Sequence, residues 1–308
     1  MAEEALTPPE PYGPSETVVF YSDGVRLVGD IFRPTEPPPP SGYPTVIVCH
    51  GFGGIKEFFV GDIARALTAH GFLAMSFDYR GFGVSDGERH RLMPEEQAAD
   101  VVAVVSYLRS RDDVDQSRIG AYGTSFGGGV AIAAAALEDR IRAVVCAVGI
   151  ADCGRWLQSL RRYWEWLEFQ ERLDQDRIQR SVTGRSEVVE PEEIMVRDPH
   201  SAAHEAKLRE KYPDRAFRLT LASGEAISRF KPVECVPALG SRALMLIGVE
   251  GDTLTPFDQT EELYHAATGP KHLLTVSGIT HHEVYQPQHL FGVIESVAGF
   301  LREHMDIT

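Results

Sequence analysis

The sequence contains little of what several classes of protein require. Only four of its 308 residues are cysteine, and Cys49, Cys146, Cys153 and Cys235 show no CxxC spacing. We therefore expect reduced thiols rather than a disulfide framework. No apolar run reaches the roughly 18 to 20 residues that a membrane-spanning helix needs. Lysine and arginine total 30 against 45 acidic residues, and the net charge of −15 argues against a nucleic-acid partner or an anionic membrane surface.

The first residues also lack the pattern of a secretory signal, which has a basic start followed by an apolar stretch. Residues 1–16 are instead acidic and proline-rich, and we expect them to form a loose N-terminal arm. Together with the expected reduced cysteines, this pattern predicts a cytoplasmic location.

Apolar runs of strand length alternate with segments of helical period through most of the chain. The expected strands are Thr17–Tyr21, Val25–Phe32, Thr45–Cys49, Phe72–Phe77, Arg118–Tyr122, Ile141–Val148, Ala243–Ile247 and His272–Val276. The expected helices are Gly61–His70, Pro94–Arg109, Gly127–Leu137, Pro256–Ala267 and Leu290–His304. Strands that are apolar throughout belong in a parallel sheet covered on both faces, so the sequence predicts an α/β domain with a mostly parallel, twisted sheet.

One stretch, residues 151–232, interrupts this alternation with charged, helical segments and no convincing strand. We interpret it as a helical cap inserted after the sixth strand into a catalytic domain formed by residues 17–150 and 233–308. The cap helices are expected at Arg155–Arg177, Glu190–Glu193, His204–Tyr212 and Ser223–Arg229. Its aromatic residues Trp156, Tyr163 and Trp164 are candidates for substrate binding, although aromatics at helical spacing more often anchor a helix to a core.

The most informative motif is Gly123-Thr-Ser125-Phe-Gly127, which lies between an expected strand and an alanine-rich helix. A serine in Gly-x-Ser-x-Gly at such a junction sits on a sharp turn, the nucleophile elbow, and its hydroxyl projects above the sheet. Glycine at both flanks allows the strand and the helix to approach closely. Ser125 is therefore the candidate nucleophile.

A serine nucleophile needs a base and an acid that orients the base. His281 and His282 follow the last expected strand, and we favour His281 because it comes first after the turn. Asp252, on the loop after Ala243–Ile247, is the candidate acid, with Glu250 as the alternative. The chain order Ser125, Asp252, His281 is the order that a nucleophile elbow predicts.

An oxyanion hole requires two backbone N–H groups. Phe126, which follows the nucleophile, is expected to supply one of them. Phe52 in His50-Gly51-Phe52-Gly53-Gly54, after the strand Thr45–Cys49, is expected to supply the other.

These motifs together resemble the α/β-hydrolase superfamily. The resemblance rests on His50–Gly54, the segment Phe77–Ser85, the elbow, Asp252 and Gly278-Ile-Thr-His281, and it extends over the chain from Thr17 to Met305 except the insertion. Within the superfamily the chain is most similar to dienelactone-hydrolase-like and YcjY-type esterases and to the serine aminopeptidase-like group. In relatives the Asp78–Ser85 segment is a structural turn.

The resemblance implies a serine hydrolase that acts on a small-molecule acyl substrate without a metal or organic cofactor. Ser125 sets aside dehalogenases and epoxide hydrolases, which resemble this fold but use aspartate at the elbow, and it disfavours dienelactone hydrolysis, which uses cysteine. Among the possible substrates, a carboxylic ester is the first candidate. Carbon–carbon bond hydrolysis and amide or peptide hydrolysis are the alternatives. A purely binding role is disfavoured because all three members of the triad are present.

Overall fold

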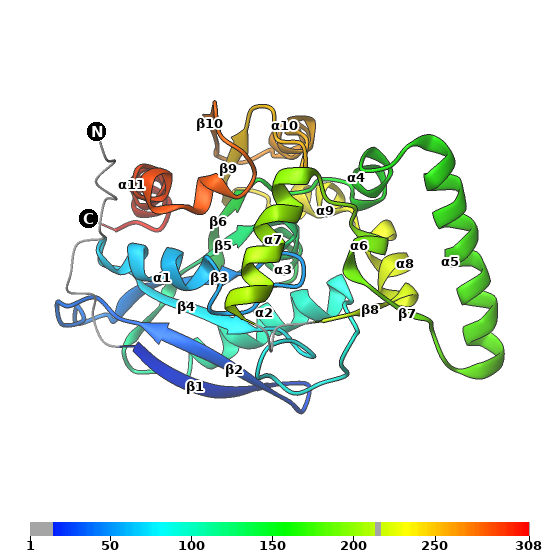
Figure 1. The fold of residues 1–308 in the computed structure, drawn as a ribbon. Helices are drawn as coiled ribbons and strands as arrows, with labels where there is room; N and C mark the ends of the chain where they lie inside the picture. The colour runs from blue at the N-terminus through cyan, green and yellow to red at the C-terminus, as the bar shows by residue number, and fades with distance from the viewer. Residues whose placement is uncertain (1–14, 213–216, 308) are drawn as a thin grey trace.

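A computed structural model describes residues 15–212 and 217–307. Its centre is an eight-stranded sheet with the strand order β1-β2-β4-β3-β5-β6-β9-β10 (Figure 1). The strands are β1 Ser15–Ser22, β2 Val25–Phe32, β3 Tyr43–Cys49, β4 Leu73–Asp78, β5 Val114–Thr124, β6 Ile141–Ala147, β9 Ala243–Val249 and β10 Lys271–Val276. The expected α/β-hydrolase architecture, with a mostly parallel sheet flanked by helices, is thereby confirmed.

The sheet is antiparallel at one edge and parallel elsewhere. Strands β1 and β2 form an antiparallel hairpin, and β2 also pairs antiparallel with β4. All later pairs in this sheet are parallel. Every residue of β3, β4 and β9 is buried, as expected for strands with a helical layer on each face. β1 begins at Ser15, inside the segment expected to be an arm, and residues 1–14 lie outside the described residues.

Helices cover both faces of the sheet. Helices α1 (Val60–Thr68) and α11 (Pro287–His304) pack on one face, where they share an apolar cluster with alternate strand residues such as Val46 and Val145. Helices α2 (Pro94–Leu108), α3 (Phe126–Leu137) and α10 (Phe257–Ala266) pack on the other face around neighbours such as Ile47. This arrangement buries both faces of the sheet.

The chain leaves the sheet after β6 and returns to it at β9, as expected for an insertion after the sixth strand. The intervening elements are α4 Cys153–Ser159, α5 Tyr163–Thr183, β7 Val188–Val189, α6 Pro191–Ile194, α7 Pro199–Lys211, β8 Leu219–Thr220, α8 Leu221–Arg229, α9 Pro232–Cys235 and a 3₁₀ turn, Val236–Leu239. Backbone hydrogen bonds join the two ends of the insertion, from Cys153 N–H to Phe230 O and from Val233 N–H to Ala151 O, both 3.0 Å.

Two expectations for the insertion need correction. The single helix expected over Arg155–Arg177 is two helices, α4 and α5, because residues 160–162 form a turn in which the Arg161 guanidinium donates to the carbonyls of Glu193 and Ile194. The insertion also contains two short strands, β7 and β8, which pair antiparallel. Two-residue strands are too short to produce an alternating pattern in the sequence.

None of the helices in the described ranges is long and apolar enough to cross a membrane. The four cysteines all lie within these ranges as free thiols, and three of them, Cys49, Cys146 and Cys153, are buried. The first two lie in the strands β3 and β6, as their apolar neighbours in the sequence indicated.

Candidate active site

Ser125 lies on the sharp turn between β5 and α3. Its φ of 53° and ψ of −124° place it in a region that side chains rarely adopt. The turn is held by a hydrogen bond from the Ser125 N–H to the Ala147 carbonyl, 2.8 Å. A Cβ atom at Gly127 would collide with the backbone carbonyl of His50, so this position requires glycine. The local sequence thus forms the elbow, and Ser125 lies at the N-terminus of α3, where partial positive charge favours a developing anion.

His281 contacts Ser125. The His281 Nε2 atom lies 3.1 Å from Ser125 Oγ, and its Nδ1 atom lies 2.7 Å from Asp252 Oδ2. The imidazole is buried. Gly278, with a φ of 76°, turns the chain after β10 and brings His281 back over the end of the sheet. His282 instead points its ring toward α7 of the insertion, where it stacks on His204.

Asp252 is held on the loop after β9 by backbone donors. Its Oδ1 accepts the N–H groups of Leu254 and Thr255 at 2.8 and 2.9 Å. Burial alone would raise the pKa of this carboxyl, but the charge and hydrogen bond of His281 and the two backbone donors outweigh burial and lower it. Glu250, the alternative acid, is exposed and accepts a hydrogen bond from Ser277 instead, 2.6 Å.

Thr255 is a neighbour of the triad that sequence reasoning missed. Its buried hydroxyl lies 2.9 Å from Asp252 Oδ2, 3.1 Å from His281 Nδ1 and 3.1 Å from the Val148 carbonyl. The hydroxyl therefore joins the acid, the base and the loop after β6. The only signal in the sequence is a hydroxyl residue three positions after the aspartate.

The two residues expected to form an oxyanion hole lie beside the nucleophile. Phe126 is the first residue of α3, directly after Ser125. Phe52 follows β3, and both Phe52 and Ser125 line the same cavity. The rings of Phe52 and Phe126 pack edge to face, with centroids 6.3 Å apart. The loop after β3 therefore lies beside the elbow.

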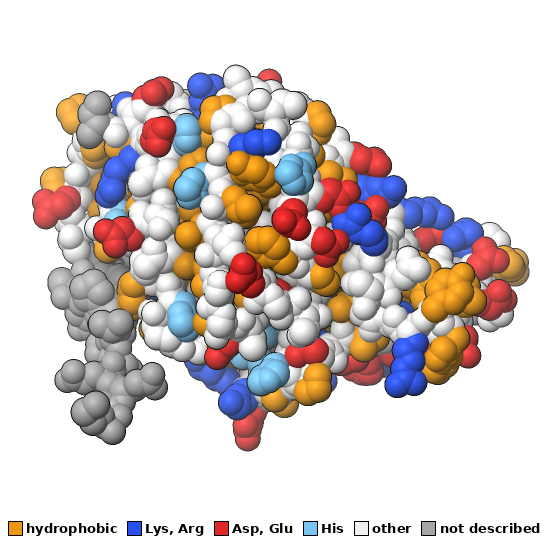
Figure 2. All heavy atoms as spheres, turned by 90° about the horizontal axis from the view of Figure 1, so that it is seen from above, with side chains coloured by type: hydrophobic (Ala, Val, Ile, Leu, Met, Phe, Trp, Pro, Cys, Tyr) orange, Lys and Arg blue, Asp and Glu red, His pale blue; other side chains and the backbone are white. Residues whose placement is uncertain are grey.

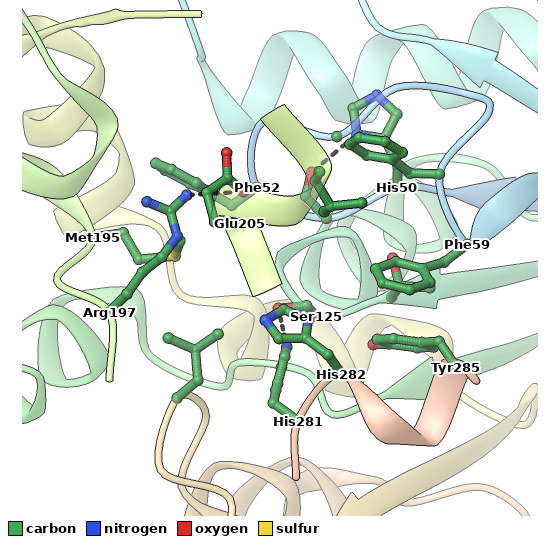
Figure 3. Close-up of a pocket in the computed structure, with 16 residues that line it drawn as sticks. His50, Phe52, Phe59, Ser125, Met195, Arg197, Glu205, His281, His282 and Tyr285 are labelled. Atoms are coloured by element: carbon green, nitrogen blue, oxygen red, sulfur yellow. Dashed lines mark hydrogen bonds and ion pairs between the residues drawn. The ribbon is translucent and has the colours of Figure 1, made fainter. Parts of the chain in front are cut away.

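A cavity of about 80 Å³ adjoins Ser125 beneath the insertion (Figure 3). Aromatic and aliphatic side chains form much of its wall. It is lined by His50, Gly51, Phe52, Gly54, Phe58, Phe59, Thr124, Ser125, Met195, Arg197, Glu205, Leu208, Leu254, His281, His282 and Tyr285. Glu205 and Leu208 belong to α7, and Met195 and Arg197 to the segment before it. The insertion therefore supplies part of the wall around the nucleophile.

The three aromatic residues expected to bind substrate do not line this cavity. Trp156 is fully buried, and its indole N–H donates to the Leu254 carbonyl, 2.7 Å. Tyr163 and Trp164 are 68% and 53% exposed on α5, which projects from the body of the molecule (Figure 1). At that projecting end Figure 2 shows apolar side chains among acidic and basic ones. The spacing of these aromatic residues predicted a helix, but it did not predict which side of that helix faces the rest of the protein.

A charged pair within the cavity was also missed. Arg197 and Glu205 both face it, and their charged groups lie 3.6 Å apart (Figure 3). Their meeting depends on how α7 packs over the sheet, so no local motif indicates it. Over residues 15–212 and 217–307, no group of three or more His, Cys, Asp or Glu side chains is arranged to hold a metal ion.

The fold and this site define the class of protein. A sequence model of the alpha/beta hydrolase fold matches residues 44–281, from β3 to the candidate base. The chain therefore belongs to the α/β-hydrolase family and is an enzyme of that family. The more detailed placement among its esterases and peptidases stays a prediction.

Particular relatives cover nearly the whole chain. An uncharacterized 31.7 kDa protein from the traX–finO intergenic region of Escherichia coli is 30% identical over 264 residues, 85% of this chain and 92% of the relative. A thiohydrolase of Eupenicillium brefeldianum is 28% identical over 300 residues, 90% of this chain and 94% of the relative. The structure of DcsB in complex with a substrate analogue superposes with a TM-score of 0.82 at 22% identity, covering 95% and 100% of the two chains, which shows a shared fold.

Proposed function

We propose that this enzyme is a serine hydrolase that cleaves an acyl compound through an acyl-enzyme on Ser125. A carboxylic ester is the first candidate substrate. The observation that carries the proposal is the continuous contact from Ser125 Oγ to His281 Nε2 (3.1 Å) and from His281 Nδ1 to Asp252 Oδ2 (2.7 Å). A serine hydroxyl is a poor nucleophile at neutral pH unless a base accepts its proton, and this arrangement supplies that base.

The proposed reaction has two halves. Ser125 Oγ attacks the substrate carbonyl while its proton passes to His281 Nε2, and Asp252 stabilises the resulting imidazolium. The backbone N–H groups of Phe52 and Phe126 hydrogen-bond to the oxyanion. His281 then gives the proton to the leaving alcohol, which departs and leaves an ester on Ser125. In the second half a water, deprotonated by His281, attacks this ester and releases the acid and the free serine.

A thioester is the second candidate substrate, because a relative that aligns over 90% of this chain is named a thiohydrolase. The triad would act in the same way on a thioester, with a thiol as the leaving group. Carbon–carbon and amide cleavage, the alternatives that the sequence left open, would also use this triad, but no feature of the cavity favours them.

We further propose that residues 151–232 act as the lid of a catalytic domain formed by residues 17–150 and 233–308. Glu205 and Leu208 support this role because they close one side of the cavity that contains Ser125. The cytoplasmic location expected from the cysteine usage remains part of the proposal.

Labelling with a fluorophosphonate and turnover of p-nitrophenyl acetate test the proposed function. Wild-type protein should be labelled and should hydrolyse the ester, whereas Ser125→Ala should do neither. Replacement of His281 by alanine should lower the rate about 10²- to 10⁴-fold, the usual contribution of a general base. His282→Ala tests the other histidine of the pair, and it should lose less activity than His281→Ala, because the ring nitrogen that lies 3.1 Å from Ser125 Oγ belongs to His281. Absence of labelling in the folded wild-type protein would contradict the proposal.

A further inference from the structure

Trp156 connects the insertion to the loop that carries Asp252. It lies on α4, the first helix of the insertion, and is only 1% exposed. Its indole N–H donates to the Leu254 carbonyl at 2.7 Å. Leu254 follows Asp252 by two residues and lines the cavity that contains Ser125. The insertion therefore contacts the backbone of the loop that holds the candidate acid.

The peptide group between Leu254 and Thr255 has a hydrogen-bond partner on each side. Its carbonyl accepts from Trp156, and its N–H, which belongs to Thr255, donates to Asp252 Oδ1 at 2.9 Å. The other carboxylate oxygen, Oδ2, lies 2.7 Å from His281 Nδ1. A hydrogen bond accepted by a carbonyl polarises the amide and strengthens its N–H as a donor. Trp156 thus begins a chain of contacts that ends at the candidate base.

The groups in this chain are buried, so solvent does not readily replace a lost hydrogen bond. Asp252 and Thr255 are 5% and 2% exposed. Burial alone would raise the pKa of the Asp252 carboxyl, but His281 and the backbone donors outweigh burial and lower it. The charged state and the orientation of this carboxylate therefore depend on the donors that surround it.

The helix that carries Trp156 is itself held in place at its start. The buried Gln259 of α10 accepts the N–H groups of Ala151 and Asp152 on its Oε1, at 3.0 and 3.1 Å. The Asp152 side chain caps α4 by accepting the Arg155 N–H at 3.0 Å. In Figure 1, α4 lies against the body of the molecule, whereas α5 projects from it. A group that orients a catalytic residue needs support of this kind.

We infer that Trp156 is a positioning residue for the reaction, because its indole N–H holds the peptide group that orients Asp252. The insertion then contributes to catalysis as well as to the wall of the cavity. This inference rests on the proposed function, since it requires Asp252 and His281 to activate Ser125. A role for Trp156 as a plain anchor predicts lower stability without slower catalysis.

Trp156→Phe removes the indole N–H and keeps an aromatic ring in the core. With p-nitrophenyl acetate, kcat should fall roughly 3- to 10-fold, as expected for loss of one buried hydrogen bond, while KM changes little. Urea unfolding establishes that the variant is folded under the conditions of the assay. Replacement of Trp156 by benzothienylalanine, in which sulfur takes the place of the indole N–H, removes the donor with almost no change of shape. It should lower kcat to the same extent, and it tests the inference even if Trp156→Phe does not fold.

Addition of Trp156→Phe to Asp252→Asn tests whether the indole acts through the carboxylate. Residues that act through one another are not additive in their effects. In the Asp252→Asn background, Trp156→Phe should therefore change kcat less than about twofold. The same loss of kcat in both backgrounds would overturn a role that acts through Asp252.

Trp166→Phe is the matched control, because it makes the same chemical change elsewhere in the insertion. Trp166 lies on α5 and packs against Phe169, with ring centroids 5.9 Å apart. Both kcat and KM should stay as in the wild type. A loss of kcat equal to that of Trp156→Phe would show that any disturbance of the insertion slows the reaction, and would overturn the inference.

The remaining outcomes separate the inference from the proposed function. A folded Trp156→Phe enzyme with unchanged kcat, whether or not KM changes, would overturn the positioning role. If a fluorophosphonate labels Ser125 in the wild-type protein, that result leaves the proposed function standing. Failure of both labelling and turnover in the wild-type protein would overturn the proposed function and this inference together.

Discussion

The imidazole rings of His204 and His282 stack with their centroids 4.3 Å apart and their planes 15° apart. His204 belongs to α7 of the insertion, and His282 adjoins His281, whose ring it meets edge to face at 4.9 Å. Phe59 lies parallel to both rings. Phe59 also has a φ of 38°, an uncommon conformation for a residue other than glycine. A stack of three rings therefore connects α7 of the insertion to the loop that carries the candidate base.

We predict that His204→Ala increases activity on long acyl chains. The cavity of about 80 Å³ is smaller than the roughly 150 Å³ that accommodates benzene, and a shift of α7 would enlarge the space available to a long chain. Because an aromatic pair contributes about 1 kcal/mol, its loss should raise the ratio of kcat/KM for p-nitrophenyl octanoate to that for the acetate roughly fivefold. His200→Ala, an exposed position on the same helix, should leave this ratio unchanged. An unchanged ratio in His204→Ala would contradict the prediction.

Thr255→Val should slow the reaction without weakening substrate binding. The substitution keeps the shape of the side chain but removes the hydroxyl that contacts Asp252 and His281. Loss of one buried hydrogen bond corresponds to roughly a 5- to 20-fold decrease in kcat. Steady-state kinetics on p-nitrophenyl acetate should show little change in KM. Thr255→Ser, which restores the hydroxyl, should recover most of the activity, and a Ser variant as slow as the Val variant would refute a positioning role for this hydroxyl.

Gly127→Ala should destabilise the fold strongly. The added Cβ would meet the carbonyls of His50 and Cys49, which are backbone atoms and cannot rotate away. We expect a loss of more than about 3 kcal/mol in the free energy of unfolding, measured by urea denaturation. Gly299→Ala is the matched control, because Gly299 lies on the exposed side of α11 with open space around it. Alanine there should stabilise the protein by up to about 1 kcal/mol.

Asp78 should make stability fall as the pH rises. Burial raises the pKa of this carboxyl from 3.8 to about 6, although it accepts hydrogen bonds from the Lys56 and Val84 N–H groups. Between pH 3.8 and about pH 6, the Asp78 carboxyl binds its proton more tightly in the folded state than in the unfolded chain. The free energy of unfolding therefore decreases with increasing pH in this window. It should then level off above about pH 7.

The comparison with Asp78→Asn isolates this contribution, because asparagine does not titrate. Between about pH 5 and about pH 7.5, the wild-type protein should lose roughly 1 to 2 kcal/mol of stability relative to the variant. Urea unfolding at the two pH values measures the difference. The opposite sign, with the wild type gaining relative stability toward neutral pH, would show that the pKa of Asp78 is lowered in the folded protein.

Local sequence determines most of what could be predicted. The sheet strands were predictable because strands buried on both faces must be apolar throughout, and the elbow was predictable because Gly123 and Gly127 are required by its backbone. The positions of Asp252 and His281 followed from chain order along the sheet. The structure brings these two residues together with Ser125, and their catalytic roles remain predictions.

The insertion was predicted less well, because its geometry depends on contacts far apart in the sequence. Trp156 and Trp164 lie eight residues apart, yet one is buried and the other exposed. The break before α5 depends on Arg161 reaching the backbone of Glu193 and Ile194. Arg197 reaches the cavity only when the segment before α7 packs over it. A pattern with helical period carries none of this information.

The hydrogen bonds between the two ends of the insertion hold the points where it leaves and rejoins the rest of the chain close together. Because Ala151 and Val233 are already neighbours, a short connection is long enough to join them in place of the residues between. Ser125, Asp252 and His281 all lie outside that segment. If the insertion acts as the proposed lid, a chimera that carries another relative's insertion should retain Ser125 as its nucleophile while acquiring that relative's selectivity.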